Sequence, residues 1–223
     1  MHRLVIALAI LMVSRSHAAE ASCKTLMASP GTPVFTDALD QAPVEPAWKA
    51  AKGEWKVVDG SWRARELSAD HHGAVARRAL AVTNFVLRCE VRLDGAKGTS
   101  ISINGPKEHL ARVSFGPKGV QVRKDDRDHD GPDKAKTFAN RLKAIPAPGE
   151  WHTVVLEMVG DTMVASVDGE LAGWGADPSF NQLKGNVGLT VAGEFAAFRN
   201  LTVWNASVKP EWPATRTTIE TTP

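Results

Sequence analysis

The stretch that most constrains the fold runs from Gly149 to Gly169, GEWHTVVLEMVGDTMVASVDG. Apolar residues recur at every second position on both sides of Gly160-Asp161, which is the period of a β-strand. Glycine and aspartate tolerate the positive φ angles of a tight hairpin turn. The stretch therefore predicts two antiparallel strands, closed by a second turn at Asp168-Gly169. A ladder with one apolar side is typical of an antiparallel sheet packed on a core, so we expect a β-sandwich.

Other predicted strands divide in the same way into an apolar and a polar side. On residues 84–93, Phe85, Leu87, Cys89 and Val91 form the apolar side. If the strands that follow are its neighbours, their polar sides form one surface. A solvated sheet face is one interpretation, and a sugar-binding face with fixed donors and acceptors is the other. The polar residues of this predicted surface are Arg88, Glu90, Arg92, Ser100, Ser102, Asn104, Arg112, Gln121 and Arg123.

Three further segments accompany the hairpin: GEWKVVDG (53–60), NFVL (84–87) and FRNLTV (198–203). Together with the hairpin they resemble the 3-keto-disaccharide hydrolase-type domains of secreted bacterial proteins. These domains are similar to concanavalin A-like lectin/glucanase sandwiches, including laminin G-like domains. The resemblance spans residues 33–206 and implies an all-β fold, a two-sheet antiparallel jelly-roll β-sandwich.

The resemblance also implies hydrolysis or elimination at a 3-keto-glycoside, although the Glu-x-Asp-x-x-Glu run of related glycosidases does not occur in this sequence. Base chemistry next to a ketone needs a base and a group that stabilises the enolate. The candidates for these roles are Asp70, His71, Glu90 and Arg112. The alternative, favoured by the lack of an evident acid pair, is a non-catalytic glycan- or protein-binding module. A structural domain that binds no sugar is a third possibility.

Substrate binding is assigned to polar residues of the same surface and to one tryptophan. Trp174 lies between small residues in a segment, 171–182, that is predicted to be irregular, so its ring could stack on a sugar. The alternative for Trp174 is a side chain that packs over the sheet edge. The substrate-binding candidates are Arg88, Arg92, Ser102, Asn104, Arg123 and Trp174.

The two ends of the chain differ in character from the middle. Residues 1–19 have the pattern of a signal peptide: a basic start at Arg3, an apolar run and a small-residue cleavage zone. We therefore expect a secreted or periplasmic protein with a leader at residues 20–32 and the sandwich at 33–206. Residues 207–223 are rich in proline and threonine and poor in apolar residues, which predicts a disordered tail.

The net charge and the cysteine content limit the classes of partner that this chain is expected to bind. The formal net charge is +2, and signal cleavage would remove Arg3 and Arg15 but no acidic residue. Nothing in this balance indicates nucleic-acid binding, and no apolar run is long enough for a membrane span. The expected partner is a carbohydrate. Cys23 and Cys89 could form a disulfide in an exported chain, or Cys89 could be a buried small hydrophobe.

A charged loop raises the question of a metal. Asp126, Asp128 and Asp130 precede Gly131 with the alternate spacing of a calcium-binding loop. Residue 137 is a threonine, which cannot supply the bidentate carboxylate that usually closes such a site. Three basic residues also flank the loop. We therefore expect a solvated charged loop and no cofactor, with calcium as the alternative.

Overall fold

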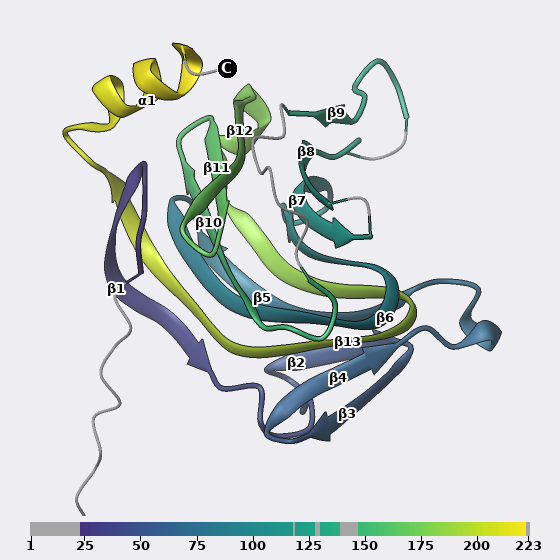
Figure 1. Cartoon of the computed structure of the whole chain (residues 1–223). Helices are drawn as coiled ribbons and strands as arrows, with labels where there is room; N and C mark the ends of the chain where they lie inside the picture. Colours follow the sequence, from purple (N-terminus) through teal and green to yellow (C-terminus); the bar gives the residue numbers. More distant parts are fainter. Residues whose placement is uncertain (1–22, 118, 128–129, 139–146, 222–223) are drawn as a thin grey trace, which may run out of the picture.

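The computed structural model describes residues 23–221 except residues 118, 128–129 and 139–146. The predicted signal peptide lies outside these residues. Within them, the strands join into one antiparallel sheet of 13 strands, which bends into two walls around a core (Figure 1). The predicted all-β sandwich is therefore confirmed. No helix among the described residues is long and apolar enough to cross a membrane.

Two long strands carry the bend. Strands β6 (Phe85–Asn104) and β13 (Lys184–Val208) pair antiparallel along almost their whole length, and register shifts interrupt the pairing between Ala192 and Phe195. Such bulges let a strand turn sharply while its ladder continues. The residue pattern predicts separate strands on either side of this point: residues 84–93 and a strand around Ile101 and Ile103 in β6, and residues 185–192 and 194–204 in β13. That prediction is wrong, because each pair of segments is one continuous bent strand that serves both walls (Figure 1).

One wall, sheet one, forms on the Phe85 half of β6. This half pairs with the predicted hairpin, which the structure confirms as β10 and β11. The segment predicted to be irregular at 171–182 instead begins with a strand, β12, followed by the short helix η2 (Pro178–Phe180). Sheet one consists of β12 (Glu170–Ala176), β11 (Thr162–Val167), β10 (His152–Val159), the first half of β6, the second half of β13 and β1 (Ala28–Asp37).

The other wall, sheet two, forms on the Asn104 half of β6. It consists of β9 (Lys136–Thr137), β8 (Gly119–Lys124), β7 (His109–Gly116), the second half of β6, the first half of β13, β5 (Ala74–Val82) and β2 (Trp48–Lys52). At the bend, β4 (Ser61–Arg65) pairs with β13, and β3 (Glu54–Val58) pairs with β4. The turn η1 (Ser68–Asp70) then leads into β5.

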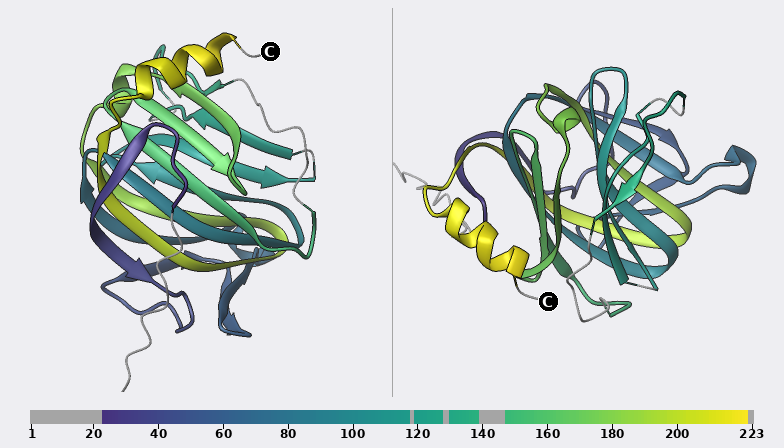
Figure 2. Two further views of the ribbon diagram at one scale, coloured as in Figure 1. Left: turned by 60° about the vertical axis from the view of Figure 1, so that its left-hand side comes forward. Right: turned by 90° about the horizontal axis from the view of Figure 1, so that it is seen from above.

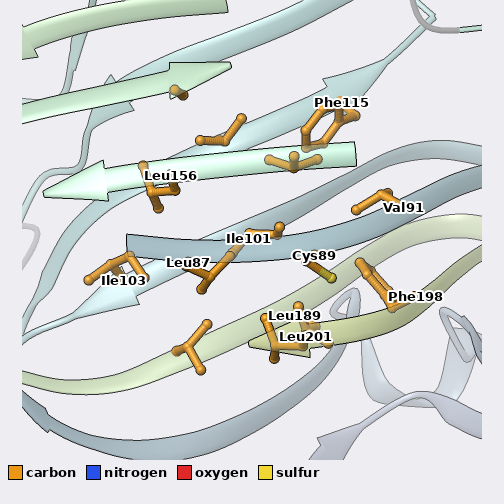
Figure 3. Close-up of a cluster of buried hydrophobic side chains, with 14 of the residues drawn as sticks. Leu87, Cys89, Val91, Ile101, Ile103, Phe115, Leu156, Leu189, Phe198 and Leu201 are labelled. Atoms are coloured by element: carbon orange, nitrogen blue, oxygen red, sulfur yellow. The ribbon is translucent and has the colours of Figure 1, made fainter. Parts of the chain in front are cut away.

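The core lies between the walls. Apolar side chains from both sheets fill it, with Leu87, Cys89 and Leu156 from sheet one facing Ile101, Ile103 and Leu189 from sheet two (Figure 3). All six are fully buried. Their spacing of two along each strand confirms the predicted apolar sides.

The outer side of sheet one is also covered. The segment ahead of β1 crosses it, and helix α1 (Trp212–Thr221) lies beside β11 and β12 (Figure 2). Met27 and Trp212 pack there against Val164 and are nearly inaccessible to solvent. The predictions of an unstructured leader at 20–32 and a disordered tail at 207–223 are therefore wrong for the described residues. Met27 and Trp212 contribute the buried apolar contacts by which these segments dock on the sheet.

Both cysteines are free thiols. Cys23 packs on the outer side of sheet one near Val86, whereas Cys89 points into the core on the other side of the same sheet. A disulfide needs Cα atoms within about 7 Å and converging side chains, which the intervening sheet prevents. Cys89 is thus a buried small hydrophobe, which was the second of the two interpretations.

Candidate functional site

The outer side of sheet two carries three cross-strand rows of polar residues, which we call the polar face. Its members come from β13, β6, β7 and β8, and the ladder places them side by side. Ser100, Ser102 and Asn104 are 5–6% exposed although they point away from the core. Ser100, Ser102, Asn104, Arg112, Ser114, Gln121 and Arg123 were predicted from the strand pattern, and Asn186 and Thr190 are added by the structure.

Asp125 holds the two arginines of the polar face, Arg112 and Arg123. Asp125 Oδ2 accepts from Arg112 Nε at 2.8 Å, and Asp125 Oδ1 accepts from Arg123 Nε at 2.9 Å. Asp125 is only 1% exposed, so both of its oxygens are used inside the protein. A buried carboxylate with two charge-assisted hydrogen bonds fixes the guanidinium groups in place. The carboxylate itself is not available for acid–base work.

Asn186, Asn104 and His109 form a chain of hydrogen bonds across the polar face. Asn104 Nδ2 donates to Asn186 Oδ1 at 2.7 Å, which leaves Asn104 Oδ1 to accept from His109 Nδ1 at 2.8 Å. These residues line a cavity of about 450 Å³ together with Arg77, Glu108 and Arg127. Glu108 is engaged as well, by Arg127 Nε at 2.6 Å and by Gln182 Nε2 at 2.6 Å.

A second cavity, of about 270 Å³, brings a histidine to the polar face. Its lining includes His72, Ser100, Arg112, Ser114 and Thr190. His72 Nδ1 lies 2.8 Å from the carbonyl oxygen of Gly73. Because a carbonyl only accepts hydrogen bonds, Nδ1 carries the proton and Nε2 has the lone pair. An arginine, hydroxyl groups and a basic ring nitrogen thus share one hollow.

The predicted catalytic set is not assembled as a unit. Arg112 lies on the polar face, but the carboxylate of Asp70 accepts from Gly53 N at 2.6 Å, and His71 is exposed in the left-handed region (φ 48°) at the end of η1. The neighbour of His71, His72, takes the place next to Arg112. His71 and His72 are adjacent in the sequence, and the strand pattern alone does not decide which of the two rings faces the sheet.

Glu90 lies on the other wall. Its outer-face position on β6 falls in the half of the strand that belongs to sheet one, where it accepts from Arg88 and from Arg199. Burial raises the pKa of Glu90, but hydrogen bonds from Arg199, Asn200 and Arg88 outweigh burial, so this pKa is lowered. The prediction that Glu90 shares a surface with Arg112 is therefore wrong, because β6 bends between them.

The substrate-binding candidates Arg88 and Arg92 lie on that same outer side of sheet one. Arg92 makes two hydrogen bonds to Asp94, at 2.8 and 2.9 Å, and lies 4.8 Å from the ring centre of Trp151. They belong to a network of ion pairs at the bend, apart from the polar face. Of the predicted binding residues, Ser102, Asn104 and Arg123 remain on the polar face.

Trp174 does not present a free ring. It is half-buried on β12 next to Trp212 and Ile219 of α1, and the guanidinium carbon of Arg216 lies 5.2 Å from its ring centre. The prediction that Trp174 stacks on a sugar is wrong for this arrangement. The ring packs over the sheet edge, which was the other interpretation.

The acidic loop is only partly described. Asp128 lies outside the described residues, Asp126 is 3.7 Å from Lys134 Nζ, and Asp130 Oδ1 accepts from Gly131 N at 2.8 Å. Among the described residues, no three His, Cys, Asp or Glu side chains are grouped as a metal site would require. Calcium at this loop therefore stays an untested alternative.

Solved structures place the fold in a class. A carbohydrate-binding module from Bacillus subtilis is 17% identical, with a TM-score of 0.58 over 71% of this chain and 96% of that chain. A Bacillus licheniformis beta-glucanase is 12% identical, with a TM-score of 0.55 over 79% and 99%. A GlcNAcα1-4Gal-releasing endo-β-galactosidase from Clostridium perfringens is 9% identical, with a TM-score of 0.63 over 82% of this chain and 64% of that chain. The class is the concanavalin A-like sandwich, in which binding modules and enzymes share one architecture.

The family is narrower than the class. Residues 39–204 match the 3-keto-alpha-glucoside-1,2-lyase-like domain, and the chain belongs to this carbohydrate-active family. No curated protein sequence matches the chain significantly. The resemblance seen in the sequence is therefore confirmed at the level of the family.

Proposed function

We propose that the chain is a 3-keto-glycoside lyase or hydrolase whose reaction takes place on the polar face, between His72 and Arg112. The observation that carries this proposal is their shared cavity, which combines a basic ring nitrogen with a fixed guanidinium group. Membership of the 3-keto-alpha-glucoside-1,2-lyase-like family supports the substrate class. His72 thus replaces Asp70, His71 and Glu90 in the role of base.

The proposed reaction uses a general base, a group that stabilises the enolate, and the return of the proton to the leaving group. A ketone at C3 acidifies the hydrogen on C2, so Nε2 of His72 takes this proton as general base. Negative charge then develops on the C3 oxygen, and the guanidinium of Arg112 stabilises it. Collapse of the enolate breaks the bond from C1 to the leaving oxygen and forms a C1–C2 double bond. The imidazolium of His72 returns the proton to the leaving group, so atoms and charge balance; addition of water to the product would complete hydrolysis.

The rest of the polar face orients the sugar. Ser100, Ser102, Asn104 and Asn186 present hydroxyl and amide groups held in strands, where little entropy is lost on binding. The Asp125 clamp keeps Arg112 in one orientation before substrate arrives. Preorganised donors of this kind are what an enolate oxygen requires.

A non-catalytic glycan-binding module is the second candidate. The observation in its favour is that Asp125, which holds Arg112 and Arg123, and Glu108, which lines the cavity at His109, are both bound to arginines. A face without an available carboxylate suits recognition as well as it suits histidine-based elimination. The two functions use the same residues, so only turnover separates them.

The deciding experiment compares a 3-keto-α-glucoside with its unoxidised parent. We expect the purified chain to convert the 3-keto compound to the unsaturated 3-keto sugar or its hydrate, followed by NMR, and to leave the parent intact because the C2 hydrogen is not acidic there. Saturable binding of the 3-keto compound, seen by calorimetry without conversion, would identify a binding module. If neither conversion nor binding occurs, the polar face is a solvated surface.

We also propose that the chain is exported to the periplasm or the medium. The apolar run after Arg3 and the small residues at 16–19 support this, and cleavage there would leave the docked segment from Cys23 onward intact. Intact-mass analysis of protein from the cell exterior or periplasm of a bacterial host should place the N-terminus between Ala19 and Ser22. A chain found there that still begins at Met1 would contradict the proposal.

A further inference from the structure

A larger cavity adjoins the one that holds His72 and Arg112. Its volume is about 680 Å³. Phe115, Pro117, Val120 and Phe138 form apolar walls, and the polar residues that also line it are Lys97, Ser114, Gln121 and Thr137. Pockets of roughly 300–1,000 Å³ are typical of small-molecule sites. We call this hollow the aglycone cavity, for the reason that follows.

The two cavities are neighbours, because Gly98, Ser114 and Phe115 line both of them. Their characters differ sharply, since one has an imidazole, a guanidinium and hydroxyl groups and the other has aromatic and aliphatic walls. A ligand that fits both must be polar at one end and apolar at the other.

The main aromatic wall is held rigidly. Phe138 N donates to Val122 O at 2.9 Å, and the ring packs edge-on against Phe180 with the ring centres 6.2 Å apart. The other side of the ring lies on Gly175, where a Cβ would come within 2.1 Å of it. Only glycine permits this contact, so β12 fixes the ring before any ligand binds. A preformed wall binds without the cost of ordering it.

We propose that the aglycone cavity binds an aromatic leaving group, so that the substrates are aryl 3-keto-glucosides. The position of the sugar follows the proposed function, but the preference for an aryl group does not depend on turnover. A second sugar would place several hydroxyl groups against Phe115, Val120 and Phe138, which offer them no side-chain hydrogen bonds. An aryl group loses nothing there and gains burial and edge contacts with the Phe138 ring.

The test compares phenyl and methyl α-glucosides in two measurements. In the first, kcat/KM is measured for the 3-keto forms; in the second, calorimetry gives Kd for the unoxidised forms, which need not react. Burial of one ring predicts a preference for phenyl of about 30-fold in both. A preference below about 3-fold in both measurements would overturn the proposal, even if turnover is present.

Variants at the exposed rim locate the effect. Thr137→Glu and Thr137→Lys place a charge of either sign at the apolar cavity and should reduce the preference to about 5-fold or less, whereas Thr137→Val should retain it. The result is read as the ratio of phenyl to methyl values, so that a change common to both substrates cancels; Thr137 lines the larger cavity and not the His72 cavity. If the charged variants keep the wild-type preference, the aryl group binds elsewhere and the proposal fails.

The outcomes for the two proposals can be told apart. Tight binding of phenyl α-glucoside with no conversion of any 3-keto-glucoside would support the aglycone cavity and refute the lyase function. Turnover with equal rates for phenyl and methyl compounds would support the lyase function and refute the aglycone cavity.

Discussion

Replacement of His72 by alanine is expected to lower kcat/KM for a 3-keto-α-glucoside by at least about 100-fold. A positioned general base contributes roughly 10²–10⁴-fold, and the carboxylates of Asp125, beneath Arg112 and Arg123, and of Glu108 are both occupied by arginines. Initial rates can be followed as release of the leaving alcohol. His72 is exposed, so the substitution should change the free energy of unfolding by no more than about 0.5 kcal/mol.

The neighbouring histidine offers a matched control. His71→Ala removes the same chemical group one residue away, outside the lining of the cavity, and should leave turnover within about 2-fold. Equal losses in both variants would indicate a general effect on the turn after η1. Full activity of His72→Ala would show that His72 is not the base. A loss of activity in His71→Ala alone would restore His71 as the candidate, as predicted from the sequence.

The central hairpin was predictable because its determinants are local. The period of two and the turn residues Gly160-Asp161 act within twenty residues, and neither depends on the rest of the chain. The same holds for the alternation of Ile101 and Ile103 with Ser100, Ser102 and Asn104. The register between strands then brought Arg112 and Arg123 into the same face, as expected from their phase.

The bend in β6 was not predictable, and it caused the main error in the site. The alternation along a strand indicates which side of the sheet a side chain faces. It does not indicate to which wall of a curved sheet that part of the strand belongs. Glu90 and Ser100 share a phase, yet they lie on the two sides of the register shift near Phe195. Sheet curvature depends on pairing between β6 and β13, which are separated by some eighty residues of sequence.

The cover of sheet one was missed for a different reason. Composition predicts order from the amount of apolar surface, and the two terminal segments are poor in it. Their docking depends on a few residues that meet a prepared surface: Met27 and Trp212 over Val164, and Trp174 beside them. In a single sequence, neither of the two residues that form such a contact can be distinguished from other apolar residues.

Glu157→Ala is expected to destabilise the protein by about 4 kcal/mol. The Glu157 side chain is fully buried on the outer side of sheet one. Its carboxylate accepts from Leu26 N at 2.8 Å, Met27 N at 2.8 Å and Ala28 N at 2.6 Å. Without it, the two buried N–H groups of Met27 and Ala28 and the partly buried N–H of Leu26 lose their partner, and each unsatisfied buried group costs about 1–3 kcal/mol. Urea unfolding gives the free energy, and hydrogen exchange at residues 26–28 should become faster than elsewhere in β1.

Glu157→Gln separates the hydrogen bonds from the packing, because it keeps the shape and one acceptor oxygen. It should cost about half as much as the alanine substitution. Both variants should retain turnover per folded molecule, since Glu157 lies on sheet one and the polar face is on sheet two. A cost below about 1 kcal/mol for Glu157→Ala would mean that the N-terminal segment contributes little to the fold. A loss of turnover in the folded variant would mean that the two walls are coupled, and that the cover of sheet one helps to shape the site on the opposite side.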